Sequence, residues 1–165
     1  MVRFKSRYLL CEVCVSNHSD LRLLDDQSVF SAVRTAVSRA HGDYGAALTN
    51  VSFSVKYLNA HTGVVFLRCR KSHYRILWSA LSFINSLKNR GQCVPCFFNC
   101  LYVGGTIRTC QKFLIRYNTR QLHRMLPQCR SEEERLEVRR AVLSCSINSF
   151  GNEEEEDDED EEHKE

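Results

Sequence analysis

Several features are scarce or missing in this 165-residue sequence, and each of them argues against a class of protein. No apolar run approaches the roughly twenty residues that a membrane-spanning helix needs. The basic start leads only into a short apolar run at residues 8–11, which ends at Glu12, so a secretory signal is not expected. A P-loop, a GxGxxG loop and a Ser-His-acid motif are also missing. We therefore expect a protein of the cytosol or nucleus without a catalytic centre.

Acidic residues are scarce up to Phe150 and crowded after it. Residues 1–150 contain 22 Lys and Arg against nine Asp and Glu, a net charge of +13, whereas ten consecutive acids run from Glu153 to Glu162. A body this basic favours a polyanionic partner, most often nucleic acid. The acidic run carries too much charge to fold. We predict one domain over residues 1–150 and a disordered acidic tail over residues 151–165.

The nine cysteines do not form a strong zinc pattern. Cys11 and Cys14 have CxxC spacing but lie in a predicted strand, where residues three apart point to opposite faces. Cys93 and Cys96 flank Pro95 at the start of another predicted strand, and no second pair accompanies them. An odd number of cysteines without a secretion signal indicates reduced thiols. We expect no metal site in the protein.

The pattern of apolar residues and turn residues predicts four strands and four helices. The strands are predicted over residues 7–15, 51–58, 64–70 and 97–103. The helices are predicted from about 25 to 41 with Gly42 as the stop, from Ser72 to a stop at Gly91, from about 106 to 125, and from a capping box at Ser131 and Glu134 to about 144.

This order, βαββαβ followed by two helices, predicts an α/β sandwich of the α+β type. Right-handed crossovers place the first two helices on one face of a four-stranded antiparallel sheet, the ferredoxin-like or RRM-like arrangement. Such a fold serves many unrelated activities, so it does not by itself indicate a function.

Basic residues are better organised than any catalytic residue type. Positive side chains recur at every fourth position of the third predicted helix, which aligns them along one side. A second group lies where the third strand meets the second helix, and a third group lies at the N-terminus. We expect RNA or DNA contact from these positions, with a solvated helix face and a solvated N-terminus as the alternatives. The residues are Arg108, Lys112, Arg116, Arg120 and Arg124; Arg68, Arg70, Lys71 and Arg75; and Arg3, Lys5 and Arg7.

The third predicted strand carries no RRM aromatic signature, because residues 63–68 read Gly-Val-Val-Phe-Leu-Arg. Base stacking on an open sheet is therefore not expected. Arg68 and Arg70 share a face with Phe66, and we expect this face to lie away from the first two helices. Tyr8, Leu10 and Phe66 are expected under the C-terminal helices, with the basic rim left to contact phosphates.

Three stretches resemble one protein family. They are residues 2–10, residues 57–70, and residues 95–98 together with Gly104-Gly105-Thr106-Ile107-Arg108 and the six residues after it. These stretches resemble the Pop-five-type protein subunit of eukaryotic ribonuclease P and ribonuclease MRP, over residues 1 to about 128. The Gly-Gly-Thr-Ile-Arg segment is the most distinctive element.

The resemblance implies a subunit that is not the catalyst. In such particles the RNA, with bound Mg²⁺, releases the 5′ leader of precursor tRNA, and the MRP particle acts on precursor ribosomal RNA. The resemblance further implies a TIM-barrel-like protein partner, a nuclear or nucleolar location and no cofactor bound by the protein. Within the matching stretches, the resemblance also implies that RNA is contacted by Arg3, Lys5, Arg7, Arg68, Arg70, Arg108 and Lys112.

Three other functions stay open on the sequence alone. A DNA-binding or chromatin protein can combine a basic body with an acidic tail. A ferredoxin-like domain can bind a small molecule, and a scaffold can present its positive charges to an acidic protein. Preference for duplex DNA, a ligand-dependent melting temperature, or salt-resistant association with a protein would favour each in turn.

Overall fold

A computed structural model describes residues 4–89, 91–125, 132–133, 135–137 and 139–140. The chain divides into two compact units, Met1–Phe113 and Leu114–Glu165. The elements follow the order β1 (Ser6–Val15), the 3₁₀ helix η1 (His18–Leu23), α1 (Asp26–Asn50), β2 (Ser54–Asn59), β3 (Val64–Arg70), α2 (Tyr74–Leu81), β4 (Ser86–Asn89), β5 (Gln92–Gly104) and α3 (Ile107–Met125).

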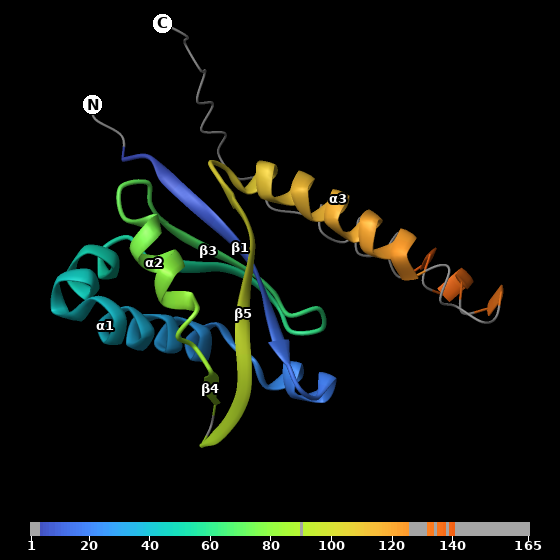
Figure 1. The fold of residues 1–165 in the computed structure, drawn as a ribbon, viewed down its shortest axis with the longest axis horizontal. Helices are drawn as coiled ribbons and strands as arrows, with labels where there is room; N and C mark the ends of the chain where they lie inside the picture. Colours follow the sequence, from blue (N-terminus) through green and yellow to red (C-terminus); the bar gives the residue numbers. More distant parts are fainter. Residues whose placement is uncertain (1–3, 90, 126–131, 134, 138, 141–165) are drawn as a thin grey trace, which may run out of the picture. The chain divides into compact units, whose positions relative to one another are not determined.

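The strands form one antiparallel sheet in the order β2-β3-β1-β5-β4. Helices α1 and α2 lie on the same side of this sheet (Figure 1). The predicted α+β sandwich is therefore confirmed. The prediction of four strands is wrong, because β4 adds a fifth strand at the edge beside β5.

The core fills the space between the sheet and the two helices. Leu9, Cys11 and Val13 alternate along β1 towards this core, and Leu67 and Cys69 do the same from β3. All five side chains are buried, which is the period-two pattern of a strand with one face on a core. We call this side the helix-covered face and the other side the opposite face.

Helix α1 is longer than predicted. Asp25 caps it by accepting a hydrogen bond from the Ser28 N–H, and Ser28 Oγ accepts in return from the Asp25 N–H. Gly42 adopts φ 62° and ψ −161° and kinks the helix at the predicted stop. Helical structure then resumes and continues to Asn50, so Gly42 interrupts the helix without ending it.

The second helix is shorter than predicted, and the difference accounts for the extra strand. Helix α2 ends at Leu81, and its N-cap is His73 rather than Ser72. Leu87 lies in β4 opposite Val94, and Gly91 lies in the turn between the two strands. The prediction that Leu87 belongs to a helix is wrong because apolar residues three apart, Ile84 and Leu87, suit a helix stripe as well as a bend followed by a short strand.

Strand β5 starts earlier than predicted and changes its inward-facing side along its length. Val94, Cys96 and Phe98 are buried, while a register shift between Leu10 and Cys11 of β1 marks a bulge. Beyond the bulge, Tyr102 is paired with Leu10 on the opposite face and stacks on Phe113 of α3, with 4.6 Å between ring centroids. The first turns of α3 therefore pack on the opposite face.

Residues 132–133, 135–137 and 139–140 are helical. The predicted capping residues Ser131 and Glu134 lie outside the described residues, as do the predicted domain boundary at residue 150 and the acidic tail.

Candidate nucleic-acid interface

Basic residues from distant parts of the chain lie at one end of the sheet, where β1 begins and β3 ends. The antiparallel register pairs Ser6 with Arg70 and Tyr8 with Arg68. The Lys71 N–H donates to the Lys5 carbonyl at 2.8 Å, which extends the pairing beyond β3. The register thus gathers a group that we call the basic strand end, made of Lys5, Arg7, Arg68, Arg70 and Lys71.

Arg68 and Arg70 lie on the opposite face of the sheet, because Leu67 and Cys69 alternate with them and point into the core. The prediction that these arginines lie away from the first two helices is confirmed. Arg68 Nε donates to Ser6 Oγ at 3.2 Å. The guanidinium carbon of Arg70 lies 4.1 Å from the centroid of the Phe4 ring. Both half-buried side chains are therefore positioned by neutral partners, and no described carboxylate compensates their charge.

Arg7 pairs with Cys69 and therefore lies on the other side of the sheet from Arg68 and Arg70, next to the start of α3. Its Nη1 donates to the Ser6 carbonyl at 3.3 Å and lies 3.3 Å from the position that a Cβ on Gly105 would take. The start of α3 is capped by Thr106 and Thr109, whose backbone N–H groups each donate to the other's hydroxyl. Arg108 and Lys112 follow on the first turns of α3 and are exposed.

No carboxylate among the described residues forms an ion pair with Arg7, Arg68 or Arg70; the ion pair Arg135–Glu132 joins two residues of the second unit. Among the acidic residues of the first unit, Glu12 lies in the far half of β1, and Asp20, Asp25, Asp26 and Asp43 come after this strand. Fixed and unneutralised guanidinium groups suit phosphate oxygens. The arrangement can bind a polyanion.

The remaining predicted contact residues do not belong to the group named the basic strand end. Arg75 is fully exposed on α2, on the helix side of the sheet, where its guanidinium contacts the Tyr74 ring and hydroxyl. Arg116, Arg120 and Arg124 are exposed on the part of α3 that belongs to the second unit. Arg3 lies outside the described residues. The structure thus brings together the groups from β1 and β3 and does not add Arg75 to them.

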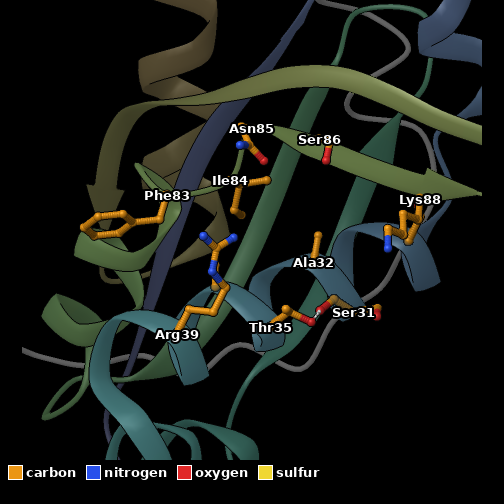
Figure 2. Close-up of a pocket in the computed structure, with 11 residues that line it drawn as sticks. Ser31, Ala32, Thr35, Arg39, Phe83, Ile84, Asn85, Ser86 and Lys88 are labelled. Atoms are coloured by element: carbon orange, nitrogen blue, oxygen red, sulfur yellow. Dashed lines mark hydrogen bonds between the residues drawn. The ribbon is translucent and has the colours of Figure 1, made fainter.

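Sequence reasoning missed a cleft between α1 and the segment that leads into β4 (Figure 2). Its volume is about 240 Å³, somewhat below the usual range of small-molecule sites. Arg39 extends from α1 towards Ile84, and Lys88 lies at the β4 side. The lining residues include hydroxyl groups but no Asp, Glu, His or Cys, so the cleft offers no obvious acid–base or metal chemistry. No sequence signal joins Arg39 to Lys88, because both line the cleft only through the β4 fold-back.

Phe4 is a further feature that was not predicted from the sequence. Its ring packs against Arg70 at the basic strand end while most of its surface stays exposed. A signal existed, because an aromatic residue lies between Arg3 and Lys5 in the sequence.

Two buried thiols, Cys11 on β1 and Cys69 on β3, belong to the core. Cys11 is buried, and a hydrogen bond with the Cys100 thiol, followed by burial, raises its pKa well above the ordinary value. Burial raises the pKa of Cys69 to about 12. Protonated buried thiols are poor nucleophiles and poor metal ligands. In the described part of the chain, no three His, Cys, Asp or Glu side chains are grouped to hold a metal ion, and no helix is long and apolar enough to span a membrane.

Comparison with known proteins identifies the family. The model of the Rpp14/Pop5 family matches residues 7–115. The ribonuclease P/MRP protein subunit POP5 of Danio rerio is 64% identical over 156 residues, which cover 93% of this chain and 92% of the relative. The Homo sapiens subunit of the same name is 56% identical over 149 residues, which cover 89% and 91%.

A chain in the cryo-EM structure of yeast ribonuclease MRP is similar with a TM-score of 0.48 and 11% identity, covering 90% of this chain and 97% of that one. The family match spans more than half of the sequence and contains most of the basic strand end, and the two vertebrate relatives align over nearly its whole length. The resemblance expected from the motifs is confirmed: the chain belongs to the Rpp14/Pop5 family.

Proposed function

We propose that this chain is a non-catalytic protein subunit of ribonuclease P and ribonuclease MRP that binds the RNA component through the basic strand end. The observation that carries the proposal is that Arg68 and Arg70 share the opposite face at the end of β3, positioned by Ser6 and Phe4, without an acidic partner among the described residues. Membership of the Rpp14/Pop5 family supports the assignment to the ribonuclease P and MRP particles. The positions of the arginines support the choice of the RNA-binding surface.

The physical role follows from the charge. A folded RNA brings phosphates together, and their repulsion opposes the compact state that catalysis needs. Arginines already positioned by Ser6 and Phe4 lose less side-chain freedom on binding than unrestrained ones would. The protein therefore lowers the electrostatic free energy that is needed to bring the RNA phosphates together. The RNA carries out the cleavage.

In this role the RNA holds the Mg²⁺ ions that activate and stabilise the reacting oxygens. The particle removes the 5′ leader of precursor tRNA, and its MRP form processes precursor ribosomal RNA. The protein itself binds no cofactor. We further propose a TIM-barrel-like protein partner and a nuclear and nucleolar location, both of which rest on the family alone.

Exposed positive charges on α3 extend the proposed contact beyond the basic strand end. Arg108 and Lys112 belong to the first unit, and Arg116 and Arg120 belong to the second. Each lies four positions from the next, so each unit presents its pair along one side of its part of the helix. We expect these residues to add salt-sensitive phosphate contacts.

The test compares two double substitutions that change the net charge equally. Arg68→Glu with Arg70→Glu should weaken binding to the RNA that co-purifies with the tagged chain by more than about tenfold. It should also lower the log–log salt slope by about one unit per lost contact. Arg39→Glu with Lys88→Glu is the matched control, because both residues are exposed on the helix side at the cleft. Fluorescence anisotropy over a salt series measures both quantities.

The outcomes separate the alternatives. Equal losses in the two variants would mean that binding follows net charge and not the basic strand end. A larger loss in the control would move the RNA to the helix side. Tighter binding of duplex DNA than of structured RNA would favour the chromatin-type alternative. Precursor-tRNA cleavage in material purified through the tagged chain would support the particle assignment independently.

A further inference from the structure

Phe4 lies two residues before β1 and exposes 71% of its surface. Its ring is nevertheless held in place, because the Arg70 guanidinium lies 4.1 Å from the ring centroid, well within cation–π distance. Arg70 is fixed in turn by the pairing of β3 with β1. One side of the aromatic ring therefore carries a positive charge, while most of the ring remains accessible to another molecule.

Other exposed aromatic residues lack this arrangement. Tyr44, Trp78, Phe83 and Phe97 are also more than half exposed. Among the exposed aromatic rings that the structure describes, Phe4 is the one with a guanidinium stacked on it. It also lies next to Lys5 in the sequence and contacts Arg70, both of which belong to the basic strand end. The exposed ring of Phe4 is thus next to positively charged side chains that can bind a polyanion.

We propose that Phe4 is a stacking platform for one unpaired base of the bound RNA, with Arg70 against the other side of the ring. Every base presents a π-face, so such a contact tolerates any sequence, and neighbouring positive charges bind the flanking phosphates. Bases within a duplex are already stacked on one another, so the platform selects an unpaired nucleotide. This inference rests on the proposed function, because it assumes RNA at the basic strand end.

The platform differs from the stacking surface of an RRM. There, exposed aromatic residues in the middle of the strands bind the bases. Phe66, in the middle of β3, is buried and stacks at a tilt on Tyr57, with 5.5 Å between the ring centroids. Phe4 precedes the sheet, at its rim. A base can therefore stack on Phe4 even though the aromatic residue in the middle of β3 is buried.

The test uses two probes that carry the same phosphates. One is a short single-stranded oligoadenylate, and the other is an abasic ribose-phosphate strand of the same length. The full chain should bind the oligoadenylate more tightly. Phe4→Leu should weaken oligoadenylate binding about tenfold and change abasic binding less than about twofold, because it removes the π-face and keeps the charges.

Phe4→Trp provides a second variant with the opposite expectation, because indole stacks at least as well as phenyl. It should retain or tighten oligoadenylate binding, and its added indole emission should be quenched by oligoadenylate but not by the abasic strand. Trp78 is present in both the wild type and the variant, so the wild-type signal provides the background. The exposure of Phe4 predicts an unchanged melting temperature for both variants.

The stacking proposal and the proposed function fail differently. If Phe4→Leu binds oligoadenylate as tightly as the wild type does, the platform is wrong. If Arg68→Glu with Arg70→Glu then still weakens both probes, RNA binding at the basic strand end stands. If that double variant binds both probes normally, RNA binding at this surface is wrong, and the platform is wrong with it.

Discussion

The two faces of the sheet use the same strands for different purposes. On the helix-covered face, β1 and β3 present Leu9, Cys11, Leu67 and Cys69, all essentially inaccessible to solvent. On the opposite face the same strands present Leu10 and Phe66, which are buried, and then charged or polar residues at one end. Because successive side chains of a strand point to opposite faces, the same strands form a packed core on one face and present charged side chains at one end of the other face.

The difference teaches where this fold can hold a function without losing stability. Residues on the helix-covered face are enclosed by α1 and α2, so a change of size there opens or overfills a packed space. At the basic strand end the side chains make single contacts with Ser6 and Phe4. Substitutions there should change binding more than folding.

Neighbouring residues on β3 give the largest expected contrast. Leu67→Ala should lower the free energy of unfolding by about 3 kcal/mol, because a fully buried leucine leaves a cavity. Arg68→Gln should lower it by less than about 1 kcal/mol, because Arg68 is half-exposed and keeps a polar group near Ser6. Urea unfolding followed by circular dichroism measures both. Similar losses would mean that Arg68 has a structural role that its contacts do not indicate.

The sequence was most informative where one face of an element is uniformly apolar. In β1 and β3 the alternation predicted both the bounds and the face on which Arg68 and Arg70 lie, and α3 was predicted to within one residue. Four-residue β4 was missed because Ile84 and Leu87 have a spacing that a helix also allows. Long-range pairing decided between the two structures, and a local pattern does not contain it.

The candidate site shows the same limit. Its residue types were apparent, because basic clusters stand out in a sequence with few acids. Which clusters meet depends on register: the pairing of Ser6 with Arg70 joins the N-terminal group to the group on β3, and leaves Arg75 on the helix side. The cleft beside Arg39 depends on the β4 fold-back and was not predictable.

Two adjacent glycines give an intermediate contrast on the opposite face. A Cβ on Gly104 would lie 2.6 Å from Thr109 Oγ1 and 2.7 Å from Cys110 Sγ, both on the first turns of α3. Gly104→Ala should therefore cost about 2 kcal/mol of unfolding free energy, since the helix has to move away. On Gly105 the nearest atom would be the end of the flexible Arg7 side chain, at 3.3 Å.

Gly105→Ala is thus the matched control, and it should be nearly neutral in stability. The comparison also separates two interpretations of the glycine pair. If the pair served only to expose backbone N–H groups to a phosphate, Gly104→Ala would change RNA binding and leave the melting temperature unchanged. If the glycine instead allows β5 to pack closely on α3, Gly104→Ala should lower the melting temperature and change RNA binding less. Thermal unfolding measures the difference.

The smallest expected effect concerns Cys110, the buried thiol that α3 places on the opposite face. Its Sγ donates to the Tyr8 carbonyl at 3.6 Å, and burial raises its pKa to about 11 from an ordinary value of 9.0. The unfolded chain therefore loses this proton first as the pH rises, so the stabilising contribution is complete below pH 9 and disappears between pH 9 and 11. By about pH 10 the loss should be on the order of 1 kcal/mol.

Cys110→Ala isolates that contribution, because all other titrating groups remain in both proteins. The wild-type free energy of unfolding should fall more steeply than that of the variant from about pH 8 to about pH 10, whatever the variant loses in packing at neutral pH. Parallel curves would mean that the Cys110 thiol is as accessible in the folded protein as in the unfolded one. In that case the first turns of α3 would not be docked on β1, and the opposite face would be more open than the structure indicates.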